Sequence, residues 1–151
     1  MSPYEHAALA VVHVLGAAVW IGALLSMLFG SIPYARRSGD LAALRHVGKI
    51  VVGRIGFAAL VVQLVTGLRL TLWLLPSLGA LFTSPSGAGH IILTKLVLLL
   101  VVFMIGGYVY HRMLPRLTPE RLGSFTAMTW ALTIVSILIL IAGVIARTGI
   151  V

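Results

Sequence analysis

The chain has 151 residues, of which 60% are hydrophobic and 9% are charged, whereas an average soluble domain has roughly 25% charged residues. These proportions exclude an ordinary soluble protein and predict an integral membrane protein, so we attribute the formal net charge of +8 to membrane topology and not to nucleic-acid binding. The absence of cysteine excludes disulfides and thiolate metal sites.

The first half of the sequence predicts two transmembrane helices. Residues 7–29 form a hydrophobic run long enough to cross a bilayer, and no Lys or Arg precedes it as in a signal peptide, so we expect the segment to be retained. Residues 30–40 are expected to be a loop in which Pro33 breaks the helix. Residues 41–75 predict one long helix with a basic start at the interface and a span at about 55–75.

The second half predicts two more helices. Residues 76–88 contain two prolines and no charge, which is typical of a loop. The run 89–113 predicts a third span that carries one charge, Lys95, and a tight connection leads to a fourth span at about 122–147. The predicted fold class is therefore all-α: one integral membrane domain, 1–151, built as a four-helix antiparallel bundle.

The distribution of Lys and Arg predicts the orientation of these helices. Positive residues cluster in the first and third loops and the adjoining turns, and the middle loop has none. By the positive-inside rule the first and third loops are cytoplasmic, and both termini lie outside the cytoplasmic (inner) membrane. The residues counted are Arg36, Arg37, Arg45, Lys49 and Arg54 for the first loop, and Arg112, Arg116 and Arg121 for the third.

Three polar side chains are expected at one depth in the outer half of the membrane. At 1.5 Å per residue, His13, Arg69 and Lys95 each lie roughly 9 Å from the outer end of their own span. The acidic residues of the chain all lie outside the spans, so an anionic ligand would balance the two cations. The alternatives are that Arg69 and Lys95 extend to lipid headgroups and that His13 bonds a neighbouring helix in the core.

A haem, such as haem b, is an anionic ligand that fits this set. It needs an axial imidazole and carries two propionates, so His13 would be the metal ligand and Gly16 would make room for the ring. Lys95 and Arg69 would meet the propionates, or Lys95 would be a second axial ligand. The spans offer no second histidine at this depth, which predicts a five-coordinate or mixed-ligand haem.

Four stretches carry a family resemblance that covers essentially the whole chain. HVLGAAVWIGALLS in the first span, LVTGLRLTLWL in the second, TSPSGAGHIILTKLVLLL entering the third and YHRMLP leaving it resemble the copper-resistance D (CopD) domain. The pattern is also similar to the HemJ-type protoporphyrinogen oxidases, which are haem-binding four-helix membrane proteins. The resemblance implies roles for His13 and Lys95, and either haem-dependent oxidoreductase chemistry or copper passage.

Two further functions are kept as alternatives. Copper transport or resistance would need soft ligands along a route, but Met27, Met104 and Met128 show no paired spacing. An accessory subunit of a larger complex is the other alternative, because small-residue pairs such as Ala18 and Gly22 permit close helix contact or oligomerisation. The expected partners are the lipid bilayer and a membrane or extracytoplasmic redox partner.

Overall fold

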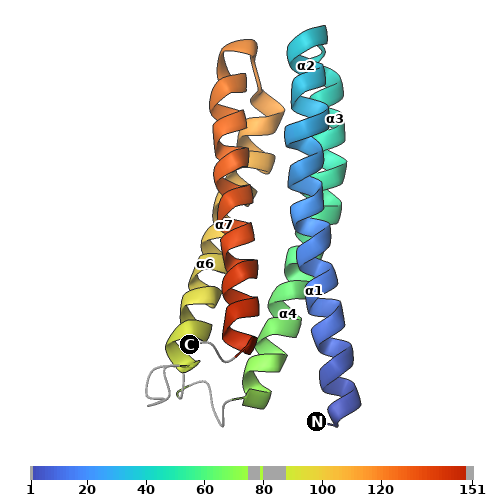
Figure 1. Cartoon of the computed structure of the whole chain (residues 1–151). Helices are drawn as coiled ribbons and strands as arrows, with labels where there is room; N and C mark the ends of the chain where they lie inside the picture. The colour runs from blue at the N-terminus through green and yellow to red at the C-terminus, as the bar shows by residue number, and fades with distance from the viewer. Residues whose placement is uncertain (1, 75–78, 80–87, 149–151) are drawn as a thin grey trace.

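The computed structural model describes residues 2–74, Gly79 and 88–148, and within these ranges the chain is helical without any strand. This confirms the predicted all-α fold class for the described residues. Four long helical runs lie lengthwise beside one another (Figure 1). The expected loop at 76–88 lies outside the described residues, apart from Gly79 and Ala88.

The first run begins at a well-capped helix end. The Ser2 hydroxyl accepts a hydrogen bond from the Glu5 backbone N–H, and the Glu5 carboxylate accepts one from the Ser2 N–H, which together form a capping box. The run then consists of α1 (Pro3–Ser26), a π-helical segment (Met27–Ser31) and α2 (Ile32–Ser38).

The expectation of a loop at residues 30–40 is wrong, because the helix continues through Pro33 as far as Ser38. Pro33 lacks a backbone N–H and would clash with the carbonyl one turn earlier in a regular α-helix. The π-helical segment directly before it has longer hydrogen-bond spacing, and it accommodates the ring without ending the helix. The chain instead turns at Gly39, whose φ of +74° is a left-handed conformation that glycine adopts readily.

The remaining runs follow the predicted order. Asp40 caps the second run by accepting a hydrogen bond from the Ala43 N–H at 2.8 Å. The second run comprises α3 (Leu41–Ile50), a π-helical segment (Val51–Gly56) and α4 (Phe57–Leu74). The third comprises α6 (Ala88–Tyr108), a π-helical segment (Val109–Met113) and a 3₁₀ turn (Leu114–Arg116), and the fourth comprises a 3₁₀ turn (Pro119–Arg121) and α7 (Leu122–Thr148).

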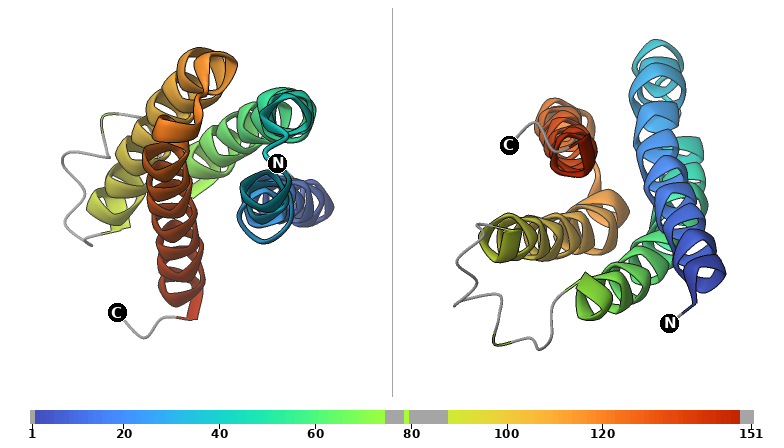
Figure 2. Two further views of the ribbon diagram at one scale, coloured as in Figure 1. Left: turned by 90° about the horizontal axis from the view of Figure 1, so that it is seen from above. Right: turned by 60° about the horizontal axis from the view of Figure 1, so that its bottom comes forward.

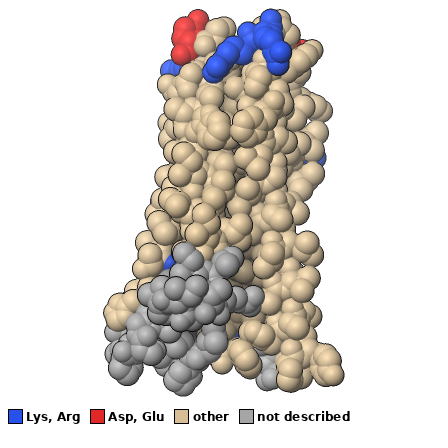
Figure 3. All heavy atoms as spheres, in the orientation of Figure 1, with Lys and Arg blue, Asp and Glu red and all other residues tan. Residues whose placement is uncertain are grey.

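Each run contains a helix that is long and apolar enough to cross a membrane. The first, Pro3–Ser38, has 36 residues and so spans about 54 Å, which exceeds a hydrocarbon core of roughly 30 Å. On the face shown in Figure 3, charged side chains gather at the end of the molecule where α2 lies, and the flank below is almost entirely uncharged. The first two runs therefore extend beyond the apolar layer at their basic end.

The hydrophobic core lies in the half of the molecule that contains α2, α3 and the connection from α6 to α7. Among the described side chains, the first buried residue of α1 is Gly16, the first of α6 is Val102 and the last of α7 is Ser136. In the opposite half, where α1 begins, few of the described side chains are buried, Thr66 and Thr71 of α4 among them, and the helix ends are spread apart (Figure 2, right). Buried core residues include Trp20, Leu24, Met27, Leu28, Ile32, Leu44, Val52, Leu60, Val102, Val109, Leu114, Phe125 and Leu132.

Candidate functional site

A hydrogen bond between α1 and α7 provides a reference level inside the molecule. The buried Trp20 indole donates its Nε1–H to the Ser136 hydroxyl at 2.9 Å, and that hydroxyl donates to the Leu132 carbonyl at 2.7 Å. Gly56 and Gly106 make room for the indole, since a methyl group on either would lie 3.0–3.3 Å from its ring atoms. Along α1, Trp20 is the first residue of the hydrophobic core.

His13 lies seven residues before Trp20, which places it on the same face of α1 and about 10 Å further from the core. Its Nδ1 is 3.0 Å from the Thr66 hydroxyl oxygen on α4. The imidazole also lies against Gly67, because a methyl group there would be 3.0 Å from its Cε1 atom. His13 is thus held against α4 by two adjacent residues.

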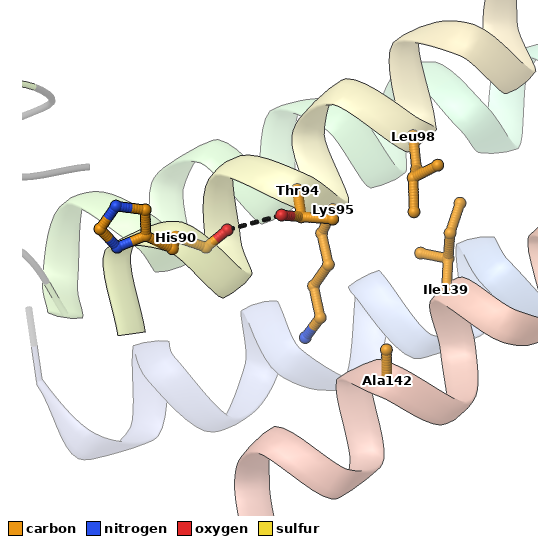
Figure 4. A pocket seen from close by; sticks show the side chains of 6 residues that line it. All are labelled: His90, Thr94, Lys95, Leu98, Ile139 and Ala142. Atoms are coloured by element: carbon orange, nitrogen blue, oxygen red, sulfur yellow. Dashed lines mark hydrogen bonds between the residues drawn. The ribbon is translucent and has the colours of Figure 1, made fainter. Parts of the chain in front are cut away.

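Lys95 reaches the same level from the other pair of helices. Its side chain extends from α6 towards α7 (Figure 4), and a methyl group on Gly143 would lie 3.5 Å from the ammonium nitrogen. Gly143 is seven residues after Ser136, so it too lies about 10 Å beyond the Trp20–Ser136 bond, on the same face of α7. By residue counting, the His13 imidazole and the Lys95 ammonium each lie about two helical turns beyond the Trp20–Ser136 bond, which defines the His13–Lys95 layer.

An open hollow of about 240 Å³ adjoins Lys95 between α6 and α7. Leu98, Ile139 and Ala142 give it an apolar wall, whereas Lys95, Thr94 and His90 supply polar groups (Figure 4). The Thr94 hydroxyl donates to the His90 carbonyl at 2.8 Å, so its proton is used within α6. The hollow therefore combines one positive group with an apolar wall.

The other predicted site residues lie in different surroundings. Arg69 is exposed on α4, about one turn beyond Thr66. Gly16 is buried where α1 meets α4, and a methyl group there would lie 3.1 Å from the Ala59 carbonyl oxygen. The space that Gly16 leaves is thus used for close packing of the two helices. Among the described residues, no group of three or more His, Cys, Asp or Glu side chains is placed to hold a metal ion.

The sequence reasoning did not single out the glycines that receive the polar side chains. Gly67 takes the His13 ring and Gly143 takes the end of Lys95. A glycine inside a transmembrane helix signals a close approach, but the sequence does not identify the approaching group. Gly67 directly follows Thr66 in the second span, and a hydroxyl residue next to a glycine is the sequence signal that could have identified Gly67.

Comparisons with protein-family models, curated proteins and solved structures find no match for this chain. The resemblance to the copper-resistance D and HemJ-type proteins therefore stays a prediction from the motifs.

Proposed function

We propose that the protein is an antiparallel four-helix bundle in the cytoplasmic membrane that binds haem b, or another porphyrin, in its outer half for a redox role. The four long apolar helices support the membrane location. The basic residues at the α2 and α3 end support a cytoplasmic position for that end, with both termini outside. The half where α1 begins is then the extracytoplasmic half.

One observation carries this proposal: the His13 imidazole lies against Thr66 and Gly67 of α4, the Lys95 ammonium lies beside Gly143 of α7, and residue counting puts each about 10 Å beyond the Trp20–Ser136 bond. An ionisable side chain within a transmembrane helix usually faces the interior of the bundle and marks a functional site. His13 would supply a nitrogen ligand to the haem iron, and Lys95 would either bind a propionate or supply a second ligand. The apolar wall beside Lys95 suits the edge of a porphyrin, and its ammonium suits an attached carboxylate.

The remaining residues of the predicted set have smaller parts. Arg69, exposed and further from the core, would bind a second propionate at the mouth or a lipid headgroup. Gly16 contributes to the contact between α1 and α4. A bound haem would supply one-electron redox chemistry to a membrane or extracytoplasmic partner.

A haem titration of the purified protein tests the proposal. In mild detergent, the unchanged chain should develop a Soret band that saturates at one haem per chain. The His13→Ala variant should lose it, whereas His46→Ala, at an exposed position of α3 near the basic end, should keep it. Failure of the unchanged chain to bind haem, or equal binding by the His13→Ala variant, would contradict the proposal.

Labelling of single cysteines tests the orientation, because the chain has no cysteine of its own. Tyr4 is 88% exposed near the start of the first helical run, and Ser38 is exposed at the opposite end of that run. A membrane-impermeant maleimide should label Tyr4→Cys in intact cells and label Ser38→Cys only after permeabilisation. The reverse pattern would invert the proposed topology.

Assays of further variants distinguish haem binding from the two alternative functions. Copper passage predicts metal accumulation in expressing cells that stops in the Met104→Ala or Met128→Ala variant; Met104 is 66% exposed on α6, whereas Met27 is fully buried in the core. An accessory subunit would co-purify with a larger complex and would tolerate both His13→Ala and Lys95→Ala. Haem binding abolished by His13→Ala supports the proposal over both alternatives.

A further inference from the structure

A chain of three polar groups links His13 to the backbone of α4. His13 Nδ1 lies 3.0 Å from Thr66 Oγ1, and Thr66 Oγ1 lies 2.7 Å from the Val62 carbonyl oxygen and 3.3 Å from that of Gln63. Thr66 is 6% exposed, so its hydroxyl is shielded from water. The Thr66 hydroxyl proton therefore has to point at one of these neighbouring groups.

The two shorter contacts of Thr66 Oγ1, with Val62 and His13, can both be favourable with one placement of the protons. A carbonyl oxygen only accepts, so the contact of 2.7 Å needs the hydroxyl proton to point at Val62. If the hydroxyl donated to His13 instead, two oxygens would face each other at 2.7 Å without a proton between them. With the hydroxyl proton directed at Val62, Oγ1 accepts from His13, and Nδ1 must carry the hydrogen.

Gly67 sets the position of the ring from the same helix. A methyl group there would lie 3.0 Å from His13 Cε1, 3.5 Å from Nδ1 and 3.9 Å from Nε2, so the imidazole edge lies directly over the glycine. Any larger residue would push the ring away from Thr66. The pair Thr66–Gly67 thus fixes both the proton and the place of the imidazole.

We propose that Thr66 is a positioning residue that holds His13 in the Nδ1–H tautomer, in which Nε2 is the ring nitrogen that carries the lone pair. The link to haem iron rests on the proposed function, whereas the tautomer is a property of the ligand-free chain. Metal-binding histidines in proteins usually donate their other ring N–H to an oxygen in this way, and losing that oxygen typically lowers metal affinity about 10–100-fold.

Nitrogen-15 NMR of histidine-labelled, ligand-free protein in detergent tests the tautomer directly. At a pH of about 8, a neutral imidazole shows which ring nitrogen carries the hydrogen, and His13→Gln identifies the His13 signals among those of the five histidines. The unchanged chain and Thr66→Ser should show Nδ1–H, whereas Thr66→Val, which keeps the volume and removes the hydroxyl, should shift His13 towards Nε2–H. An Nε2–H tautomer in the unchanged chain, or no change in Thr66→Val, overturns the proposal.

Thr71→Val is a matched control. Thr71 is also buried on α4, and its hydroxyl donates to the Gly67 carbonyl at 2.9 Å, so it bonds its own helix as Thr66 does. This variant should leave the His13 tautomer unchanged. A shift as large as that of Thr66→Val would mean that any lost hydroxyl on α4 disturbs the ring, which would overturn a specific role for Thr66.

Haem titration of the same variants tests the consequence for binding. Thr66→Val should bind haem about 10–100-fold more weakly than the unchanged chain, and Thr66→Ser and Thr71→Val should bind it as the unchanged chain does. Equal affinity of Thr66→Val, with binding still abolished by His13→Ala, overturns the positioning role and leaves the proposed function intact. If the unchanged chain binds no haem, the proposed function fails, and the NMR result still decides the tautomer.

Discussion

Each half of the molecule contains a hydrogen-bonded ring side chain on α1, but the two rings lie in different surroundings. In the basic half, the indole of Trp20 is 2% exposed, and its N–H is paired with the Ser136 hydroxyl. Two turns away on the same face of α1, the half-buried His13 is paired with Thr66, and no described residue of α1 before Gly16 is buried. The closely packed Trp20 stabilises the bundle, whereas the half-buried His13 is the group that we propose binds a ligand.

Glycines show the same contrast. In the basic half, Gly56 and Gly106 leave space that the Trp20 indole fills. In the other half, Gly67 and Gly143 leave space for the His13 imidazole and the Lys95 ammonium. Glycine therefore serves packing in one half and the placement of polar groups in the other, and the variants below separate these uses.

The largest effect is expected for Trp20→Ala. This variant removes the largest fully buried side chain and leaves the Ser136 hydroxyl without its donor, so the free energy of unfolding should fall by about 3–5 kcal/mol. Reversible unfolding in mixed micelles measures it, with His13→Ala as the comparison. A loss below about 1 kcal/mol would show that the core does not depend on this residue.

Lys95→Met should change ligand affinity and not stability. It keeps the length of the side chain but removes a charged hydrogen-bond donor, so haem affinity should fall by about 1.5–3 kcal/mol, which is roughly 10–150-fold. The exposed Lys49→Met on α3 is the control and should bind haem normally. Equal affinities of the two variants would remove Lys95 from the site.

Gly48→Ala tests the packing of the basic half with a single methyl group. That methyl would lie 2.7 Å from Leu114 Cδ2 and 3.0 Å from Met27 Cε, so the side chains must shift and stability should fall by about 1–3 kcal/mol. Gly22→Ala on α1 meets nothing within 4 Å and should be neutral or stabilising by up to about 1 kcal/mol. Equal unfolding free energies of the two variants would show that the core is not closely packed around Gly48.

Part of this arrangement follows from the sequence. Hydrophobic runs predicted the four helices, and counting residues from the ends of the spans gave His13 and Lys95 similar depths, because the rise per residue of a helix is constant. Pro33 was misjudged as a helix break, since a π-helical segment before a proline leaves no clear mark in composition. The pairing of His13 with Thr66, and of Trp20 with Ser136, depends on how each helix is rotated about its axis. The spans are apolar on all faces, so their sequences do not show which face meets a neighbouring helix.

The central claim is that the layer of His13 and Lys95 binds a ligand and does not hold the fold together. Thermal unfolding of the unchanged chain and of His13→Ala, each with and without haem, tests it most directly. Without haem the two should unfold at nearly the same temperature, and haem at 100 times its Kd should stabilise only the unchanged chain, by about 2.7 kcal/mol. A His13→Ala variant as unstable as Trp20→Ala, together with an unchanged chain that gains nothing from haem, would contradict the account.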